Sequence, residues 1–201
     1  MAQSKQIRGT VEDVDQIAML ASPTRMEIVM TLEALASPTT VAELAAEMGR
    51  PADGLYYHLR ALVSSGLLEE HTEAGDQRFQ STTPRGQRVR LRYKLGESGN
   101  AKAVRRVAAG MLRMAERDFI RASNQHDTIV EGPRRELWVA RLKGWVSATD
   151  VAEINRLLVS LAKILDRPRP ARARKLIALT WLLAPLDVKP AKRSARAPKA
   201  N

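Results

Sequence analysis

The chain has 201 residues, 44% of them hydrophobic and 27% charged, an ordinary composition for a globular protein that buries a core in one or two domains. No apolar run reaches the roughly 18 residues of a membrane span, and residues 1–8 lack the apolar stretch of a signal peptide. We therefore expect a cytoplasmic protein. The chain has no cysteine, which excludes disulfides, thiolate metal sites and cysteine nucleophiles.

The net charge of +11 favours a polyanionic partner, although the charge is unevenly distributed. Residues 1–99 carry 11 Lys/Arg and 13 Asp/Glu, a net charge of −2, whereas residues 100–201 carry 22 Lys/Arg and 9 Asp/Glu, a net charge of +13. One local cluster is more informative than the total, because Asp76 is the only acid in a stretch with six basic side chains: Arg78, Arg85, Arg88, Arg90, Arg92 and Lys94.

The first predicted elements are helices. Residues 1–9 are expected to form a loose arm, and Thr10 with Asp13 resembles a capping box that opens a short helix to about Leu20. Ser22 followed by Pro23 predicts a helix over about 23–36, which Ser37-Pro38 ends. Its apolar side is expected to hold Met26, Val29, Met30, Leu32 and Ala36.

Two short helices and a hairpin are predicted next. Thr40 and Glu43 form a second capping box for a helix over 41–48 that ends at Gly49. Pro51 is expected to start another helix, which runs to about Ser65 with an apolar stripe at helical spacing: Leu55, Leu59, Leu62 and Val63. Residues 66–72 and 77–82 predict two strands joined by a turn at 74–76.

In residues 85–94, apolar residues alternate with basic ones, which predicts a strand with a basic outer face. A helix is the alternative, but it would place arginine on all sides. The basic face is either simply solvated or contacts phosphates beside the hairpin, and we favour the second interpretation. Residues 96–100 are expected to be a linker, so that residues 1–99 form a first domain.

Residues 100–187 are predicted to form a second, smaller module of helix and strand. A long helix over 101–123 has an apolar stripe, and a loop over 124–135 leads to a strand at 136–146. Ser147 and Asp150 cap a helix over about 149–165, an irregular Pro/Arg-rich segment follows at 167–174, and 176–183 is either a buried strand or a helix. Residues 188–201 form a basic tail that cannot build a core. We expect this stripe to supply much of the interface between two copies of the chain, so that 100–187 is a dimerisation or effector module; the alternative is that it packs on the 149–165 helix of the same chain. The stripe of 101–123 comprises Val104, Val107, Ala108, Met111, Leu112, Ala115 and Phe119.

The stretch Thr40–Thr82 carries the functional signal. Two short helices joined at a glycine and followed by a hairpin are the parts of a winged helix-turn-helix, whose second helix presents a polar face to the DNA major groove. The fold class is therefore mainly α with a small β component, an α+β fold. The alternative for the polar face is an ordinary solvated surface. The predicted DNA-binding residues on this helix and around the hairpin are Asp53, Tyr56, Tyr57, Arg60, Ser64, Arg78, Arg85 and Arg88.

The sequence resembles the ArsR-type winged-helix repressors over roughly residues 16–95. The resemblance is carried by the runs that start at Leu20 (LASPTRMEI), Val41 (VAELA), Tyr57 (YHLRAL) and Ser65 (SGLL). It implies a homodimer that binds operator DNA. Metal-sensing members carry cysteine ligands in the helix that matches Val41–Met48, which this chain lacks, and its histidines are far apart: His58, His71 and His126. We expect neither a metal nor another cofactor.

The leading hypothesis is a sequence-specific, double-stranded-DNA-binding repressor that acts as a homodimer. The alternative is a winged-helix adaptor that binds proteins and never DNA, which the net charge of −2 over residues 1–99 keeps open. An enzyme is not expected, because no phosphate-binding glycine loop or nucleophile motif is found. Trp138, Trp145 and Trp181 all fall in the second module. They are expected in its core, where a small-molecule effector could also bind.

Overall fold

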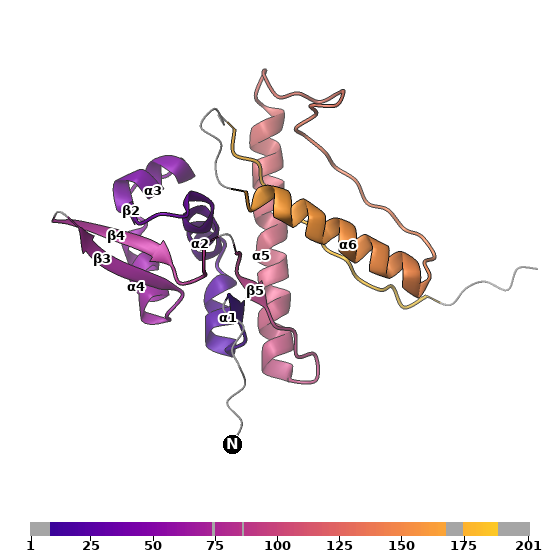
Figure 1. The fold of residues 1–201 in the computed structure, drawn as a ribbon, viewed down its shortest axis with the longest axis horizontal. Helices are drawn as coiled ribbons and strands as arrows, with labels where there is room; N and C mark the ends of the chain where they lie inside the picture. Colours follow the sequence, from indigo (N-terminus) through magenta and orange to yellow (C-terminus); the bar gives the residue numbers. More distant parts are fainter. Residues whose placement is uncertain (1–8, 74, 86, 168–174, 189–201) are drawn as a thin grey trace, which may run out of the picture.

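A computed structural model describes residues 9–73, 75–85, 87–167 and 175–188 (Figure 1). The predicted arm, the Pro/Arg-rich segment and the basic tail fall almost entirely outside these residues. The fold is α+β, as predicted. Its elements are β1 (Thr10–Val11), α1 (Val14–Leu20), α2 (Pro23–Leu35), β2 (Thr39–Thr40), α3 (Val41–Met48), α4 (Tyr56–Ser64), β3 (Leu68–Glu73), β4 (Asp76–Ser81), β5 (Arg90–Leu91), α5 (Ser98–Ser123) and α6 (Ala148–Leu165).

The first helix starts later than predicted, because Thr10 belongs to a strand. β1 pairs in parallel with β5, with Thr10 opposite Arg90. Asp13 is the N-cap of α1, and its carboxylate accepts from the backbone N–H groups of Asp15 and Gln16. The pairing partner lies 80 residues away in the chain, so local capping signals could not reveal it.

Helices α2 and α3 form as predicted, and α4 is shorter. Pro23 is in the first turn of α2, and the capping box of Thr40 and Glu43 opens α3. Gly49 follows α3 at φ +60°, in the left-handed region that favours glycine. Residues 51–55 are a turn rather than the start of a helix, and α4 begins only at Tyr56. In α2, two residues that were predicted on the apolar side are exposed: Met30 and Ala36.

The hairpin forms as predicted, whereas the basic strand is reduced to two residues. β4 pairs with β3 and with β2, both antiparallel, in a sheet of order β2-β4-β3. Only Arg90 and Leu91 of the predicted strand 85–94 are in β5. Val89 and Leu91 lie against the core, but Tyr93 and Leu95 are exposed, so the alternation does not extend along the segment.

One hydrophobic core contains side chains from the four helices α1, α2, α3 and α4, from the hairpin and from the first half of α5. Ala103 and Val107 of α5 are buried in it, and Asn100 is fully buried, where it accepts from the backbone N–H of Lys94 and donates to the carbonyl of Arg92. Gly110 permits close approach to the end of α1, since a Cβ there would lie 3.2 Å from the carbonyl oxygen of Ala21. The part of the predicted stripe around Val107 therefore packs within the chain and is not available for the predicted interface between two copies. The division into domains at residue 99 stays a prediction.

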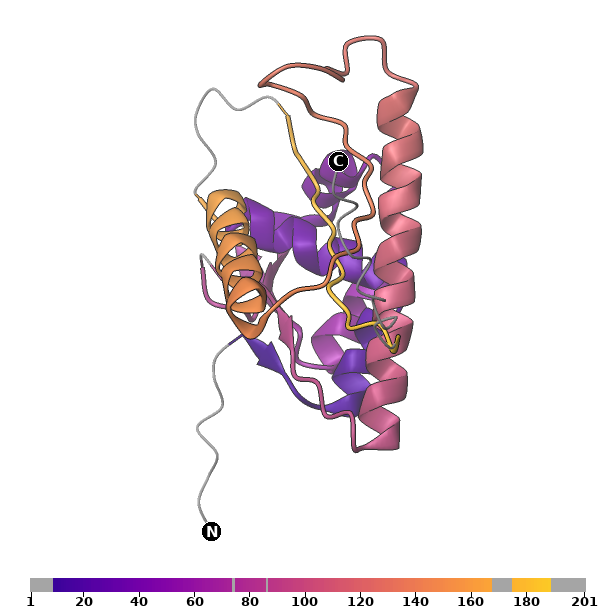
Figure 2. The same cartoon turned by 90° about the vertical axis from the view of Figure 1, so that its right-hand side faces the viewer.

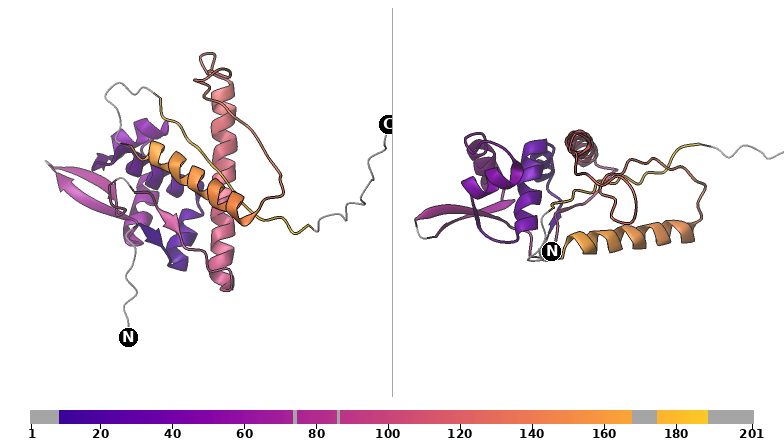
Figure 3. Two further views of the ribbon diagram at one scale, coloured as in Figure 1. Left: turned by 45° about the vertical axis from the view of Figure 1, so that its right-hand side comes forward. Right: turned by 90° about the horizontal axis from the view of Figure 1, so that it is seen from above.

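The C-terminal segment differs most from the prediction. Helix α6 forms with its predicted Ser147/Asp150 capping box, yet none of its side chains is buried. Residues 136–146 and 176–183 are extended but belong to no strand. They run beside each other between α5 and α6 (Figures 2 and 3), and Lys175 pairs with Glu136 at 2.8 Å where the two segments begin. The expectation of buried tryptophans is wrong, because all three are exposed: Trp138, Trp145 and Trp181.

Candidate nucleic-acid interface

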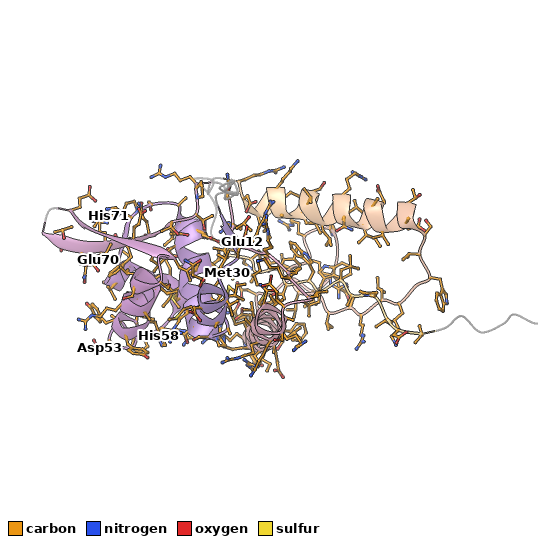
Figure 4. All side chains as sticks on the ribbon, turned by 90° about the horizontal axis from the view of Figure 1, so that it is seen from below. Glu12, Met30, Asp53, His58, Glu70 and His71 are labelled. Carbon is orange, nitrogen blue, oxygen red and sulfur yellow. The ribbon has the colours of Figure 1, made fainter. Side chains whose placement is uncertain are left out.

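Helix α4 has one face in the core and the other in solvent. Leu59 and Leu62 are completely buried, and Leu55 just before the helix is 2% exposed. These apolar side chains recur at helical spacing, which fixes the orientation of the helix on the core. The opposite face projects Tyr57, which is 70% exposed, together with Tyr56, Arg60 and Ser64. Asp53 lies at the N-terminal end of α4, on the outside of the molecule (Figure 4).

The exposed face of α4 is available to a partner. Within the described residues, Arg60 makes no hydrogen bond or ion pair. The ring of Tyr57 contacts the ring of His58 edge-on, with centroids 5.5 Å apart. The predicted residues Asp53, Tyr56, Tyr57, Arg60 and Ser64 thus share one surface, and their role in DNA binding stays a prediction.

The hairpin presents acids rather than bases. Arg78 is held between Glu43 at 3.5 Å and Glu73 at 3.3 Å, and its Nη1 donates to the carbonyl of Pro38. Around it, four exposed acids line the two strands: Glu69, Glu70, Glu73 and Asp76. Figure 4 shows Glu70 and His71 on this hairpin. Arg78 therefore does not extend a basic surface onto the hairpin.

The basic residues after the hairpin are mostly paired within the chain. Arg88 donates to Asp166 at the end of α6, Arg92 pairs with Glu12 at 2.7 Å, and Lys94 pairs with Glu97. Arg85 and Arg90 are exposed and have no ion pair within the described residues. The strand with a basic outer face that was predicted over 85–94 is not formed over that length. DNA contacts by Arg85 and Arg88 stay predictions, and for Arg88 the intramolecular pair is a competing role.

A second basic cluster lies beside α4 and was not predicted. Arg25 of α2, Arg50 after α3 and His58 of α4 converge, and the charges of both arginines act on the imidazole. Burial, and then these two charges, lower the pKa of His58. The only anion that is hydrogen-bonded to this cluster among the described residues is Glu27, which accepts from Arg50 and from Arg117 of α5. No periodic pattern in the sequence signals a cluster drawn from three elements.

A buried carboxylate lies on the other side of α2. Glu33 accepts from the backbone N–H of Val89 at 2.9 Å and from the side chain of Thr83. Burial raises the pKa of Glu33 to about 7, against the lowering effect of these hydrogen bonds and of Arg88. Glu33 therefore connects α2 to the segment after the hairpin and titrates near neutral pH.

Comparison with known protein families identifies the part of the chain that contains α2, α3 and α4. Residues 20–71 match the family model of a helix-turn-helix domain. The chain thus contains a helix-turn-helix domain, the DNA-binding unit of many transcription regulators, and α4 is the third helix of the matched segment and follows α3 across the turn at Gly49. No curated protein matches the chain. Within the described residues, no helix is long and apolar enough to cross a membrane.

Proposed function

We propose that the protein is a sequence-specific regulator of transcription that binds double-stranded DNA, as a homodimer of the ArsR type, and represses. The exposed face of α4 carries this proposal. Tyr57 is 70% exposed and Arg60 is without an intramolecular partner in the described residues, on the helix that a helix-turn-helix domain inserts into the major groove. Two tyrosines and an arginine on a solvent face supply hydrogen bonds and stacking contacts to base edges and phosphates.

Base recognition rests on α4 rather than on the hairpin. The hairpin exposes Glu69, Glu70 and Glu73, which would repel phosphates. Arg60 is the best candidate for a base contact, because arginine can donate two hydrogen bonds to a guanine edge. In ArsR-type repressors, which this chain resembles over residues 16–95, bound protein blocks the promoter.

Dimerisation is supported by apolar side chains that the single chain leaves exposed. Helix α6 buries none of its side chains, and Leu157 and Leu161 are 49% and 42% exposed. The extended segments beside it are similar: Leu142 is 91% exposed and Leu182 57%. Large apolar side chains as exposed as these, on three neighbouring segments, are typical of an interface. A second copy also supplies the second recognition helix that operator binding requires.

Selection of duplexes from a random pool with the full chain tests this function. We expect enrichment of an inverted repeat, and Arg60→Ala should weaken binding to the selected duplex by about 1–3 kcal/mol. The matched control is Arg105→Ala, because Arg105 is an exposed arginine on α5. This variant should bind the selected duplex almost as tightly as wild type. Failure to enrich any sequence would overturn the proposal. The acidic hairpin would then favour the adaptor function, in which the α4 face binds a protein.

A further inference from the structure

The basic cluster at the N-terminal half of α4 has more donors than its surroundings satisfy. The Nε atoms of Arg25 and Arg50 are buried and make no hydrogen bond, and neither does the buried Nδ1 of His58. Nη1 of Arg25 donates to the sulfur of Met19 at 3.0 Å, and Nη2 of Arg50 donates to the carboxylate of Glu27 at 2.8 Å. The remaining nitrogen of each guanidinium forms no hydrogen bond within the described residues.

Among the described residues, a single carboxylate is hydrogen-bonded to the cluster, and it does not balance the cluster's positive charge. Glu27 is shared between Arg50 and Arg117, and Arg117 also pairs with Asp118 at 3.0 Å. Arg25 forms no ion pair in the part of the chain that the structure describes. Partly buried arginines with unused donors are costly unless an anion completes their hydrogen bonds. A phosphate matches this arrangement, because its oxygens accept from several N–H groups in the fork geometry of arginine.

The cluster adjoins the face that would enter the groove. His58 is next to Tyr57 in α4, and their rings are in edge-on contact. Figure 4 shows His58 on the same side of the molecule as Asp53, and His58 is partly buried there. A helix in the major groove has a phosphate backbone along each flank, so groups beside its N-terminal half meet a phosphate when the helix is inserted.

We propose that Arg25 and Arg50, with His58 beside them, form a phosphate-binding site that clamps the DNA backbone next to α4. This inference rests on the proposed DNA-binding function and names residues outside the predicted site. It assigns the backbone contact to α2 and the turn after α3 instead of to the acidic hairpin. Glu27 orients Arg50 by holding Nη2, which leaves Nη1 for the phosphate.

The test is the salt dependence of binding to a mixed-sequence duplex of about 30 base pairs, long enough for two half-sites. Each phosphate contact contributes about 0.9 to the slope of log affinity against log salt. Arg25→Gln and Arg50→Gln should each lower the slope by about 0.9 per bound subunit. Arg105→Gln removes the same charge from the outer face of α5 and should leave the slope almost unchanged.

A second measurement uses the wild-type chain, so that it does not depend on the stability of a variant. NMR titration of His58 should show that its pKa rises when the mixed-sequence duplex is added, because the phosphate charge opposes Arg25 and Arg50. His71, on the acidic hairpin, serves as the internal reference. If the folded variants keep the wild-type slope and the pKa of His58 does not change, the phosphate-binding site is wrong, although the proposed DNA-binding function is unaffected. If wild type binds no duplex, the proposed function fails first.

Discussion

The guanidinium group of Arg88 donates from Nε to the carboxylate of Asp166, with 2.8 Å between nitrogen and oxygen. Its Nη2 also donates to the backbone carbonyl of Leu165 at 3.0 Å. Arg88 thus satisfies a carbonyl at the C-terminal end of α6, where helical carbonyls lack partners in their own helix. This pair connects the segment after the hairpin to α6 across 78 residues of chain.

Arg88→Gln should loosen the end of α6. We expect faster amide hydrogen exchange over residues 162–166, because the shorter neutral side chain cannot hold both acceptors. Arg90→Gln is the control, since Arg90 is exposed and has no ion pair within the described residues. If Arg88→Gln lowers the salt dependence of DNA binding and leaves exchange unchanged, its role is the predicted DNA contact instead.

Glu33→Gln should change how stability depends on pH. The folded-state pKa of about 7 exceeds the unfolded value of 4.5, so the folded chain retains the extra proton between these values and stability falls as pH rises through this range. Glutamine keeps an acceptor for Val89 and cannot ionise. The free energy of unfolding of the variant should rise relative to that of wild type between pH 4.5 and 7, by about 3 kcal/mol in total. Above pH 7 the difference should stay constant.

Chemical denaturation over this pH range measures the effect, and Glu43→Gln is a control of opposite sign. Hydrogen bonds from the backbone and side chain of Thr40 lower the pKa of Glu43. The stabilisation by ionised Glu43 is present above its unfolded pKa and is lost as pH falls. Glu43→Gln should therefore be less stable than wild type at neutral pH. A pH-independent difference for Glu33→Gln would show that the carboxyl group is not buried as described.

Gly49→Ala should destabilise the helix-turn-helix domain by about 1 kcal/mol, since Gly49 has φ +60° and an alanine there is strained. Nothing lies within 4 Å of a Cβ at this position, so the cost comes from the backbone alone. Gly54→Ala is the matched control, because its φ is not positive and its Cβ is equally unobstructed. It should be neutral or slightly stabilising in thermal unfolding. Equal effects would contradict the assigned turn geometry.

Two charged variants should distinguish residues of the proposed dimer interface from residues of the core: Leu161→Glu and Val107→Glu. Light scattering on wild type should give about twice the monomer mass of 22.3 kDa. Leu161 is exposed in the single chain, so its charged variant should be a folded monomer. Val107 is 1% exposed, and a carboxylate there should unfold the chain. A dimeric Leu161→Glu variant would remove α6 from the interface.

Local signals in the sequence predicted local structure well. The capping boxes at Thr40 and Ser147 mark the starts of α3 and α6, and Gly49 marks the turn between the two short helices. Such signals act within a few residues, so they are readable without the fold. Pro51 was misleading because proline starts turns as readily as helices, and α4 begins five residues later.

Relationships over long distances could not be read in this way. Arg88 was predicted on a basic face, but its partner Asp166 is separated from it by most of the C-terminal half. The cluster of Arg25, Arg50 and His58 exists only because three helical elements meet. The apolar runs 136–146 and 176–183 suggested strands, since composition alone does not distinguish paired from unpaired extended chain.

The close contact at Gly110 divides α5 into two halves with different surroundings. Gly110 is near the middle of this helix, which has 26 residues and is about 39 Å long. The first half is held in the core by buried side chains such as Asn100 and Val107, whereas no residue of α5 after Gly110 is buried. The second half therefore continues outside the buried core as a rod about 20 Å long. A partner that contacts the loop after Ser123 would meet a rod that is anchored by buried side chains at its far end only.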